Sequence, residues 1–301
     1  MEVSGYASRA YTESLAEFGE AVPLEESGGA ILARPIPGSA FSDAMGAYPL
    51  FSCRNWRGLA DDVRGLRGRF VSLVLVPDPA CPLPRAELQA AFDIVRPMND
   101  HYVIEFARFS SANISQHHAR EVRRAEKRGL ETRIAEGASD LAEDFHRLYG
   151  TLVERRRISG LRDFSLTTMQ RQMPISGSVV VCVLKGGELM GMDWYYRDRC
   201  WAYNHLSACS EAGYANSAAY LMKAAAIEYF RTKVEVLDLG GAPRLGAAGD
   251  GLRVFKSGWS TGTKPSYLCG AVLDEAEFRR LNGGRDPREE EYFPSYRRGD
   301  Y

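Results

Sequence analysis

Long apolar runs and paired cysteines are missing from this sequence. No apolar run approaches the ~20 residues that cross a bilayer as a helix. The first segment, Met1–Glu20, is polar and acidic, unlike a basic stretch followed by an apolar one. The six cysteines are scattered without a CxxC pair, which argues against a zinc knuckle and against a secreted disulfide framework. We therefore expect a cytoplasmic protein whose cysteines serve as small core residues.

Histidine is also scarce, and the net charge is close to zero. Of five histidines only His117 and His118 are adjacent, and no HExxH pattern occurs, so we expect no metal site. Lys and Arg total 38 against 39 Asp and Glu, a net charge of −1, which argues against a chain coated with positive charge for nucleic-acid binding. Any contact with RNA must then use a local basic patch.

Two familiar glycine and serine patterns are absent as well. The glycines between Gly240 and Gly251 do not meet GxGxxG, so a dinucleotide site is not indicated. No GxSxG elbow surrounds any serine, which leaves a hydrolase triad without its nucleophile.

With 301 residues, 45% of them hydrophobic, the chain is long enough for two modest cores. Apolar strand patterns alternate with amphipathic helical ones along its whole length, which predicts a mixed α/β fold. The expected strands are 30–36, 70–76, 102–106, 179–184, 189–196, 200–206, 234–239 and 267–273, and the expected helices are 56–66, 84–95, 112–128, one that follows Ser139, and 215–231.

The most specific pattern lies near the end of the predicted 234–239 strand. It reads Leu237-Asp238-Leu239-Gly240-Gly241, then a short loop, then Gly251-Leu252-Arg253-Val254-Phe255-Lys256-Ser257-Gly258-Trp259. This pattern resembles the signature of the Fem-type peptidyltransferases, a family within the N-acetyltransferase-like (GNAT) superfold. Neither Phe255 nor Lys256 has an obvious structural need to follow a flexible glycine loop, which mildly favours a functional role for the pair.

Three further stretches follow the order of that family. Asp43 with Gly46-Ala47-Tyr48-Pro49 resembles its substrate loop, with alanine where glycine is usual. The stretch His118–Leu130 is similar to its basic helix, and Asn216–Ile227 to the helix before the motif strand. The resemblance thus spans residues 43–259.

The resemblance implies two tandem GNAT-like lobes, each a mixed, mostly antiparallel sheet flanked by helices. Residues 1–136 would form the first lobe, which binds the acceptor, and residues 137–301 the second, with the catalytic motif and a C-terminal tail. The implied reaction moves an amino acid from aminoacyl-tRNA to an amine of a peptide-like acceptor, either a murein precursor or a small peptide-type metabolite. Aminoacyl-tRNA is then a co-substrate, and no other cofactor is expected.

The resemblance also implies roles for single residues. Lys256 would face the ester carbonyl, and Phe255 would lie against the terminal adenosine of the tRNA. From the chemistry, a fixed ammonium stabilises the oxyanion formed when an amine attacks an ester, and loss of a comparable donor costs ~10²–10³ in rate. An α-amine has a pKa of ~7.7–8.0, so a fraction is nucleophilic near neutral pH without a dedicated base. The sequence shows no clear base, which favours an α-amino acceptor.

Binding residues are expected on three elements. The arginines and lysine of the basic helix would follow the tRNA acceptor stem, although Glu121 and Glu126 among them are also compatible with an ordinary salt-bridged surface. Arg157 is implied as an acceptor-binding residue, and Tyr203 with Asn204 matches the tyrosine-bearing strand of the family. The predicted tRNA-binding residues are Phe255, Arg120, Arg123, Arg124 and Lys127, and the predicted substrate-binding residues are Asp43, Tyr48, Arg157, Tyr203 and Asn204.

Two other interpretations stay open. The first is an acyl-CoA-dependent GNAT N-acyltransferase, which would hold the CoA pyrophosphate at a glycine-rich helix N-terminus. The corresponding stretch, Ser210–Asn216, has one glycine, and its Glu211 would repel an anion. The second is a binding module that kept the fold without catalysis, which only an assay distinguishes.

Overall fold

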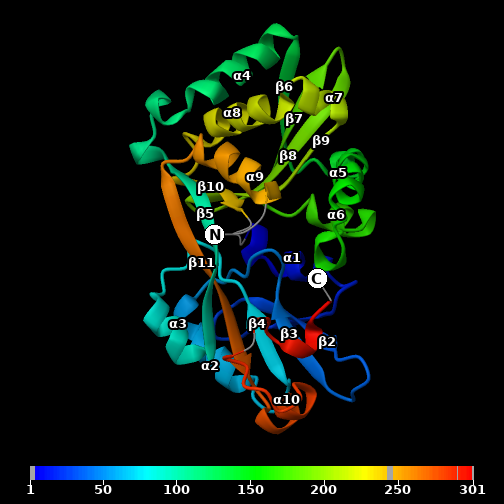
Figure 1. Cartoon of the computed structure of the whole chain (residues 1–301), viewed down its shortest axis with the longest axis vertical. Coiled ribbons are helices and arrows are strands. Elements are labelled where there is room, and N and C mark those ends of the chain that lie inside the picture. The colour runs from blue at the N-terminus through cyan, green and yellow to red at the C-terminus, as the bar shows by residue number, and fades with distance from the viewer. Residues whose placement is uncertain (1–3, 243–246, 290, 300–301) are drawn as a thin grey trace. The chain divides into compact units, whose positions relative to one another are not determined.

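The computed structural model describes residues 4–242, 247–289 and 291–299, and it divides into two compact units. Of the described residues, unit 1 contains 4–5, 99–158, 165–242 and 247–265, and unit 2 contains 6–98, 159–164, 266–289 and 291–299. Strands β5 (Ile94–Glu105) and β11 (Gly262–Val272) contribute residues to both units. Figure 1 shows the elements of each unit with their labels.

The predicted lobe boundary at residue 136 falls inside unit 1. Residues 99–136 belong with the second half of the chain because β5 pairs with β10 (Val236–Gly241) and β6 (Leu130–Glu136) pairs with β7 (Ser178–Lys185). These long-range pairings group segments that lie far apart in the sequence.

Unit 1 is built on a mostly antiparallel sheet in the order β5-β10-β9-β8-β7-β6. It includes β8 (Glu188–Asp198) and β9 (Trp201–Cys209), and the β9–β10 pair is parallel. The β7–β8 hairpin turns through Gly186 and Gly187, both with positive φ (57° and 85°), as a tight hairpin requires. The strands predicted at 179–184, 189–196, 200–206 and 234–239 are thereby confirmed.

Six helices are described in unit 1: α4 (Gln116–Lys127), α5 (Ala142–Arg156), α6 (Leu166–Gln172), α7 (Glu211–Ala215), α8 (Ala218–Phe230) and α9 (Ala247–Ser257). In Figure 1, α4 and α8 run side by side, in agreement with their packing contacts. Successive residues of β8 point to opposite faces of the sheet and pack against different helices. The Trp194 ring packs 5.5 Å from that of Phe145 on α5, whereas Tyr195 packs 5.1 Å from Phe230 on α8.

Unit 2 is a smaller sheet in the order β1-β2-β3-β4-β11, antiparallel except for the β3–β4 pair. Its strands are β1 (Glu20–Pro23), β2 (Ala30–Pro35), β3 (Ser42–Gly46), β4 (Ser72–Leu75) and the second part of β11, and its helices are α1 (Arg9–Ser14), α2 (Leu59–Gly65), α3 (Arg85–Ala91) and α10 (Glu275–Leu281). One core cluster joins Leu59 and Val63 of α2 to Leu73 of β4 and Cys269 of β11.

Two local predictions are wrong. The predicted helix 84–95 ends at Ala91, and β5 begins at Ile94. The motif residues Phe255 and Lys256 do not follow a flexible loop directly, because they lie on α9. The glycines at 249 and 251 concealed this helix, since glycine is a poor helix former. Part of the predicted glycine loop, residues 243–246, lies outside the described residues.

Candidate active site

Lys256, near the end of α9, reaches back to the end of β10. Its Nζ donates a hydrogen bond of 2.6 Å to the carbonyl oxygen of Gly241. Burial, and then the positive charge of Lys223, lowers the pKa of Lys256 to about 7, while Asp238 and Asp193 act in the opposite direction. Ammonium and free amine are therefore both populated near neutral pH.

The Nζ atom of Lys256 lies where strands β9 and β10 stop pairing. Strands β9 and β10 pair only between residues 201–203 and 236–238. Beyond that point Gly240 has a φ of +80°, and a Cβ at this position would lie 3.1 Å from the Nζ of Lys256. Glycine thus provides both the left-handed backbone and the space for the ammonium. This gives a physical reason for Gly240 in the motif.

Lys223, unlike the partly exposed Lys256, is a buried lysine. Lys223 of α8 forms an ion pair of 2.9 Å with Asp193 of β8, and both side chains are at most 4% exposed. Its Nζ also donates to the Tyr195 hydroxyl at 2.8 Å and to Asn204 Oδ1 at 3.1 Å. Burial, reinforced by the Asp193 charge, raises the pKa of Tyr195, so this hydroxyl stays protonated. The cluster is a satisfied buried network with no free charge of its own.

A histidine and aspartate dyad lies at the same strand end. His101 Nδ1 is 2.8 Å from Asp238 Oδ2, and the other carboxylate oxygen accepts the backbone N–H of Gly240 at 2.7 Å. Sequence reasoning missed His101, because it is 137 positions from its partner and matches no local pattern. The pairing of β5 with β10 brings the two side chains together.

Phe255 has a structural role that the sequence did not reveal. Its partly buried ring lies 5.6 Å from the His118 ring and 5.1 Å from that of Tyr220. His118 Nε2 donates to the Phe255 carbonyl at 2.8 Å, and Ser115 Oγ lies 2.5 Å from Nδ1. Burial lowers the pKa of His118, consistent with a neutral ring in this network. The expectation that Phe255 lacks a structural need is therefore wrong.

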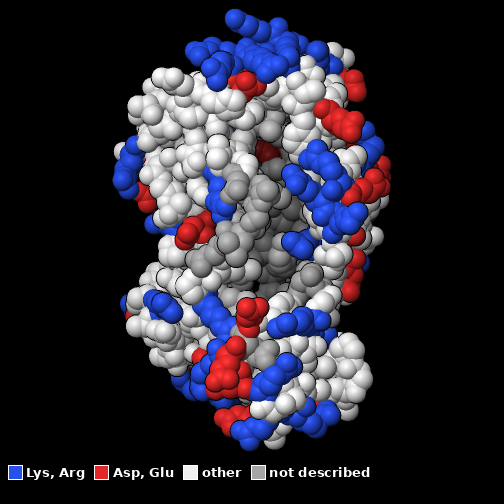
Figure 2. Space-filling view, in the orientation of Figure 1, with Lys and Arg blue, Asp and Glu red and all other residues white. Residues whose placement is uncertain are grey.

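The predicted basic helix is confirmed as α4. Its N-cap Ser115 accepts the backbone N–H of His118, and the left-handed Gly129 follows its end. Figure 2 shows lysine and arginine side chains gathered where Figure 1 places α4. The predicted tRNA contacts Arg120, Arg123, Arg124 and Lys127 are all exposed or partly exposed and line one shallow hollow. Of the two glutamates considered in the sequence, Glu121 pairs with Arg124 at 3.4 Å.

The other predicted residues of unit 1 lie in different surroundings. Asn204 is adjacent to the lysines: its Oδ1 accepts from Lys223, and its Nδ2 donates to the Trp194 carbonyl. Tyr203 is 4% exposed and stacks on Trp201 at 5.8 Å. Arg157 is exposed in a left-handed conformation (φ 52°) just after α5. Asn204 is thus the predicted binding residue that the structure brings to the lysine cluster.

Asp43 and Tyr48 belong to unit 2. The Asp43 carboxylate is 1% exposed and is held by Arg297, with Nε to Oδ2 at 2.8 Å and an Nη2 nitrogen to Oδ1 at 3.0 Å. This pair fastens the C-terminal tail to β3, so Asp43 has a structural role rather than a free binding surface. Tyr48 is partly buried, its carbonyl accepts from the Tyr11 hydroxyl at 2.6 Å, and burial raises its pKa to about 12.

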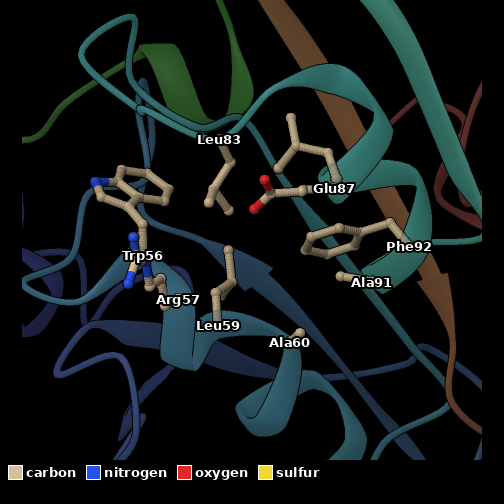
Figure 3. A pocket seen from close by; sticks show the side chains of 9 residues that line it. Trp56, Arg57, Leu59, Ala60, Leu83, Glu87, Ala91 and Phe92 are labelled. Carbon is tan, nitrogen blue, oxygen red and sulfur yellow. The ribbon is translucent and has the colours of Figure 1, made fainter.

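Unit 2 also holds a cavity of about 150 Å³ between α2 and α3. Figure 3 shows its mainly apolar wall, with the Glu87 side chain extending between those of Leu83 and Phe92. The lining residues are Trp56, Arg57, Leu59, Ala60, Leu83, Glu87, Leu88, Ala91 and Phe92. None of the predicted site residues lines this cavity.

Within the described part of the chain, no group of three or more His, Cys, Asp or Glu side chains is arranged to hold a metal ion. Among the helices that the structure describes, none is both long and apolar enough to cross a membrane.

Comparisons with known proteins give matches in structure only. No family model matches the chain, and no curated protein matches its sequence. The crystal structure of FemX matches with a TM-score of 0.68 and 10% identity, covering 91% of this chain and 93% of that chain. A C-terminal domain (DUF2156) of a putative lysylphosphatidylglycerol synthetase from Agrobacterium fabrum matches with a TM-score of 0.61 and 14% identity, covering 90% and 89%. L-PGS from Bacillus licheniformis matches with a TM-score of 0.55 and 11% identity, covering 92% and 96%.

These likenesses define the fold. The chain has the mixed α/β fold of FemX along nearly its whole length, as its sequence motifs predicted.

Proposed function

We propose that this chain is an acyltransferase that moves an amino acid from aminoacyl-tRNA to an amine of a peptide-like acceptor, forming an amide. The observation that carries this proposal is Lys256, a lysine held against the carbonyl of Gly241 at the end of β10, in a chain with the fold of FemX. The acceptor would be a murein precursor or a small peptide-type metabolite.

Lys256 supplies the chemistry that the reaction needs. When the acceptor nitrogen attacks the ester carbonyl, negative charge develops on the carbonyl oxygen, and an ammonium beside it lowers the barrier. Partial burial strengthens this interaction because less water screens it than at an open surface. The buried ion pair of Lys223 and Asp193 lies close enough to Lys256 to act on its charge, and it would help to hold the site in place during the step.

The donor is proposed from two features. The cations of α4 provide the local basic patch that contact with an RNA backbone requires. The fold is also shared with FemX and with a protein named for an aminoacylated lipid, lysylphosphatidylglycerol. For Phe255, the partly exposed ring remains the proposed contact for the terminal adenosine.

The acyl-CoA alternative gains no support from the described residues. The side chain of Ser210 caps α7 by accepting the Gly213 N–H at 3.0 Å, and Glu211 lies exposed in the first turn. A pyrophosphate would meet a carboxylate at this helix start rather than free N–H groups.

One experiment separates these donors. The purified protein is supplied with tRNA charged with radiolabelled amino acids, or with acyl-CoA, and with a panel of amines that includes a murein precursor and dipeptides; phosphatidylglycerol is added as a lipid acceptor. We expect amide product with charged tRNA, and none after ribonuclease treatment. Product that survives ribonuclease and requires CoA would overturn the proposed donor, and product on the lipid alone would overturn the proposed acceptor.

The basic surface of α4 gives a separate prediction. Replacement of its four cations by glutamine, at 120, 123, 124 and 127, is expected to raise KM for charged tRNA while kcat changes little. The slope of log KM against log salt is expected to fall by about one for each cation that no longer meets a phosphate. The matched control removes four exposed arginines elsewhere: Arg64, Arg69, Arg147 and Arg231. An equal effect in both variants would show that only net charge matters.

A further inference from the structure

We propose that His101, oriented by Asp238, is the catalytic base that accepts the proton of the attacking amine. This inference rests on the proposed function only in requiring that an amine attacks a carbonyl. It applies equally to an ester donor and to a thioester donor.

The geometry fixes the tautomer of the histidine. Asp238 is 1% exposed and its carboxylate can only accept hydrogen bonds, one from the backbone of Gly240 and one at Oδ2. The imidazole Nδ1, 2.8 Å from Oδ2, therefore carries its proton. The lone pair of a neutral ring is then on Nε2, which forms no hydrogen bond with any described residue. This is the arrangement in which a carboxylate holds a histidine ready to take a proton.

The histidine and Lys256 converge on one backbone unit. His101 lies opposite Gly241 in the β5–β10 register. A Cβ at Gly241 would be 3.5 Å from both Cδ2 and Nε2 of the imidazole, so the ring borders this glycine directly. The carbonyl oxygen of the same glycine accepts a hydrogen bond of 2.6 Å from the Nζ of Lys256. The side chain of His101 is 9% exposed, so the ring is nearly but not completely buried.

The two side chains divide the chemistry. The acceptor nitrogen bonds to the acyl carbon, and the carbonyl electron pair moves to oxygen, where the Lys256 ammonium stabilises it. The N–H proton passes to His101 Nε2, and Asp238 stabilises the resulting imidazolium. When the intermediate collapses, the bond between the acyl carbon and the leaving oxygen, or sulfur in a thioester, breaks, and Nε2 returns its proton to that atom. The step needs no oxidant, reductant or further reactant.

The test uses His101→Asn, because the asparagine Nδ2 can keep the donation to Asp238 while the basic nitrogen is lost. We expect kcat with amine acceptors to fall by about 10²–10⁴-fold, the typical contribution of general acid–base catalysis. Hydroxylamine is already unprotonated at neutral pH and depends less on a base, so the loss with this nucleophile should be at least about tenfold smaller. The control is His146→Asn on α5, a histidine outside the site, which should match the parent.

Each outcome decides the proposal. Parent rates in His101→Asn with amines would overturn the base while leaving the acyltransferase activity in place. Equal losses with amines and hydroxylamine would show that His101 only positions the site, and would also overturn it. A parent protein that acylates no amine from either donor would remove the proposed function, and the base with it.

Discussion

Replacement of Lys256 by methionine is expected to lower kcat by about 10²–10³-fold, the cost of removing one donor to an oxyanion. KM for the acceptor should change much less, because the ammonium acts on charge that develops only in the transition state. Single-turnover kinetics with the donor that supports parent activity measures the effect. A near-parent rate would remove Lys256 from the chemistry.

The pH dependence tests the same role. Because the pKa of Lys256 is lowered to about 7, its ammonium is lost as pH rises through this value. With hydroxylamine as acceptor, kcat of the parent should therefore fall above about pH 7, whereas Lys256→Arg should keep its residual rate, since arginine stays charged.

The lowered pKa of Lys256 also predicts how the stability of Lys256→Met, compared with that of the parent, changes with pH. A lysine whose pKa is lower in the folded than in the unfolded chain binds fewer protons when folded, so the parent gains stability as pH rises from about 7 toward 10.5. The methionine variant lacks this gain. The Tm of the variant minus the Tm of the parent is thus expected to be larger at about pH 6 than at about pH 10. If the variant is folded at both pH values, unfolding is excluded as the cause of its lost activity.

Replacement of Lys223 by methionine is expected to destabilise the chain by roughly 3–5 kcal/mol, the usual cost of leaving a buried charge without its partner. Asp193 is 1% exposed, and among the described residues it would keep the Tyr195 hydroxyl as its side-chain partner. Urea unfolding measures the change in the free energy of unfolding. The matched control is Lys185→Met at the exposed end of β7, which should change it by less than about 0.5 kcal/mol.

A second replacement checks the cause of that loss. Adding Asp193→Leu to Lys223→Met removes the orphaned charge and should recover part of the stability. No recovery would indicate that packing of the lysine stem, rather than the ion pair, holds the core together.

Local patterns in the sequence predicted much of unit 1. The terminal glycine of α4 and the glycine pair of the β7–β8 hairpin act within a few residues, so both could be predicted without the fold. Helix α9 was missed because glycines interrupt it, and its stability comes from packing, as the contacts of Phe255 with His118 and Tyr220 show.

The candidate site also has some residues that the sequence predicted and others that only the fold brings together. The sequence by itself determined the mixed fold, the basic helix and the lysine that follows the glycine motif, because each depends on residue type and short-range spacing. Only the tertiary structure decided that His101 meets Asp238 and that Lys223 lies buried on Asp193. Strand register and helix docking set those pairs between residues far apart in the chain, and no local preference specifies such pairings.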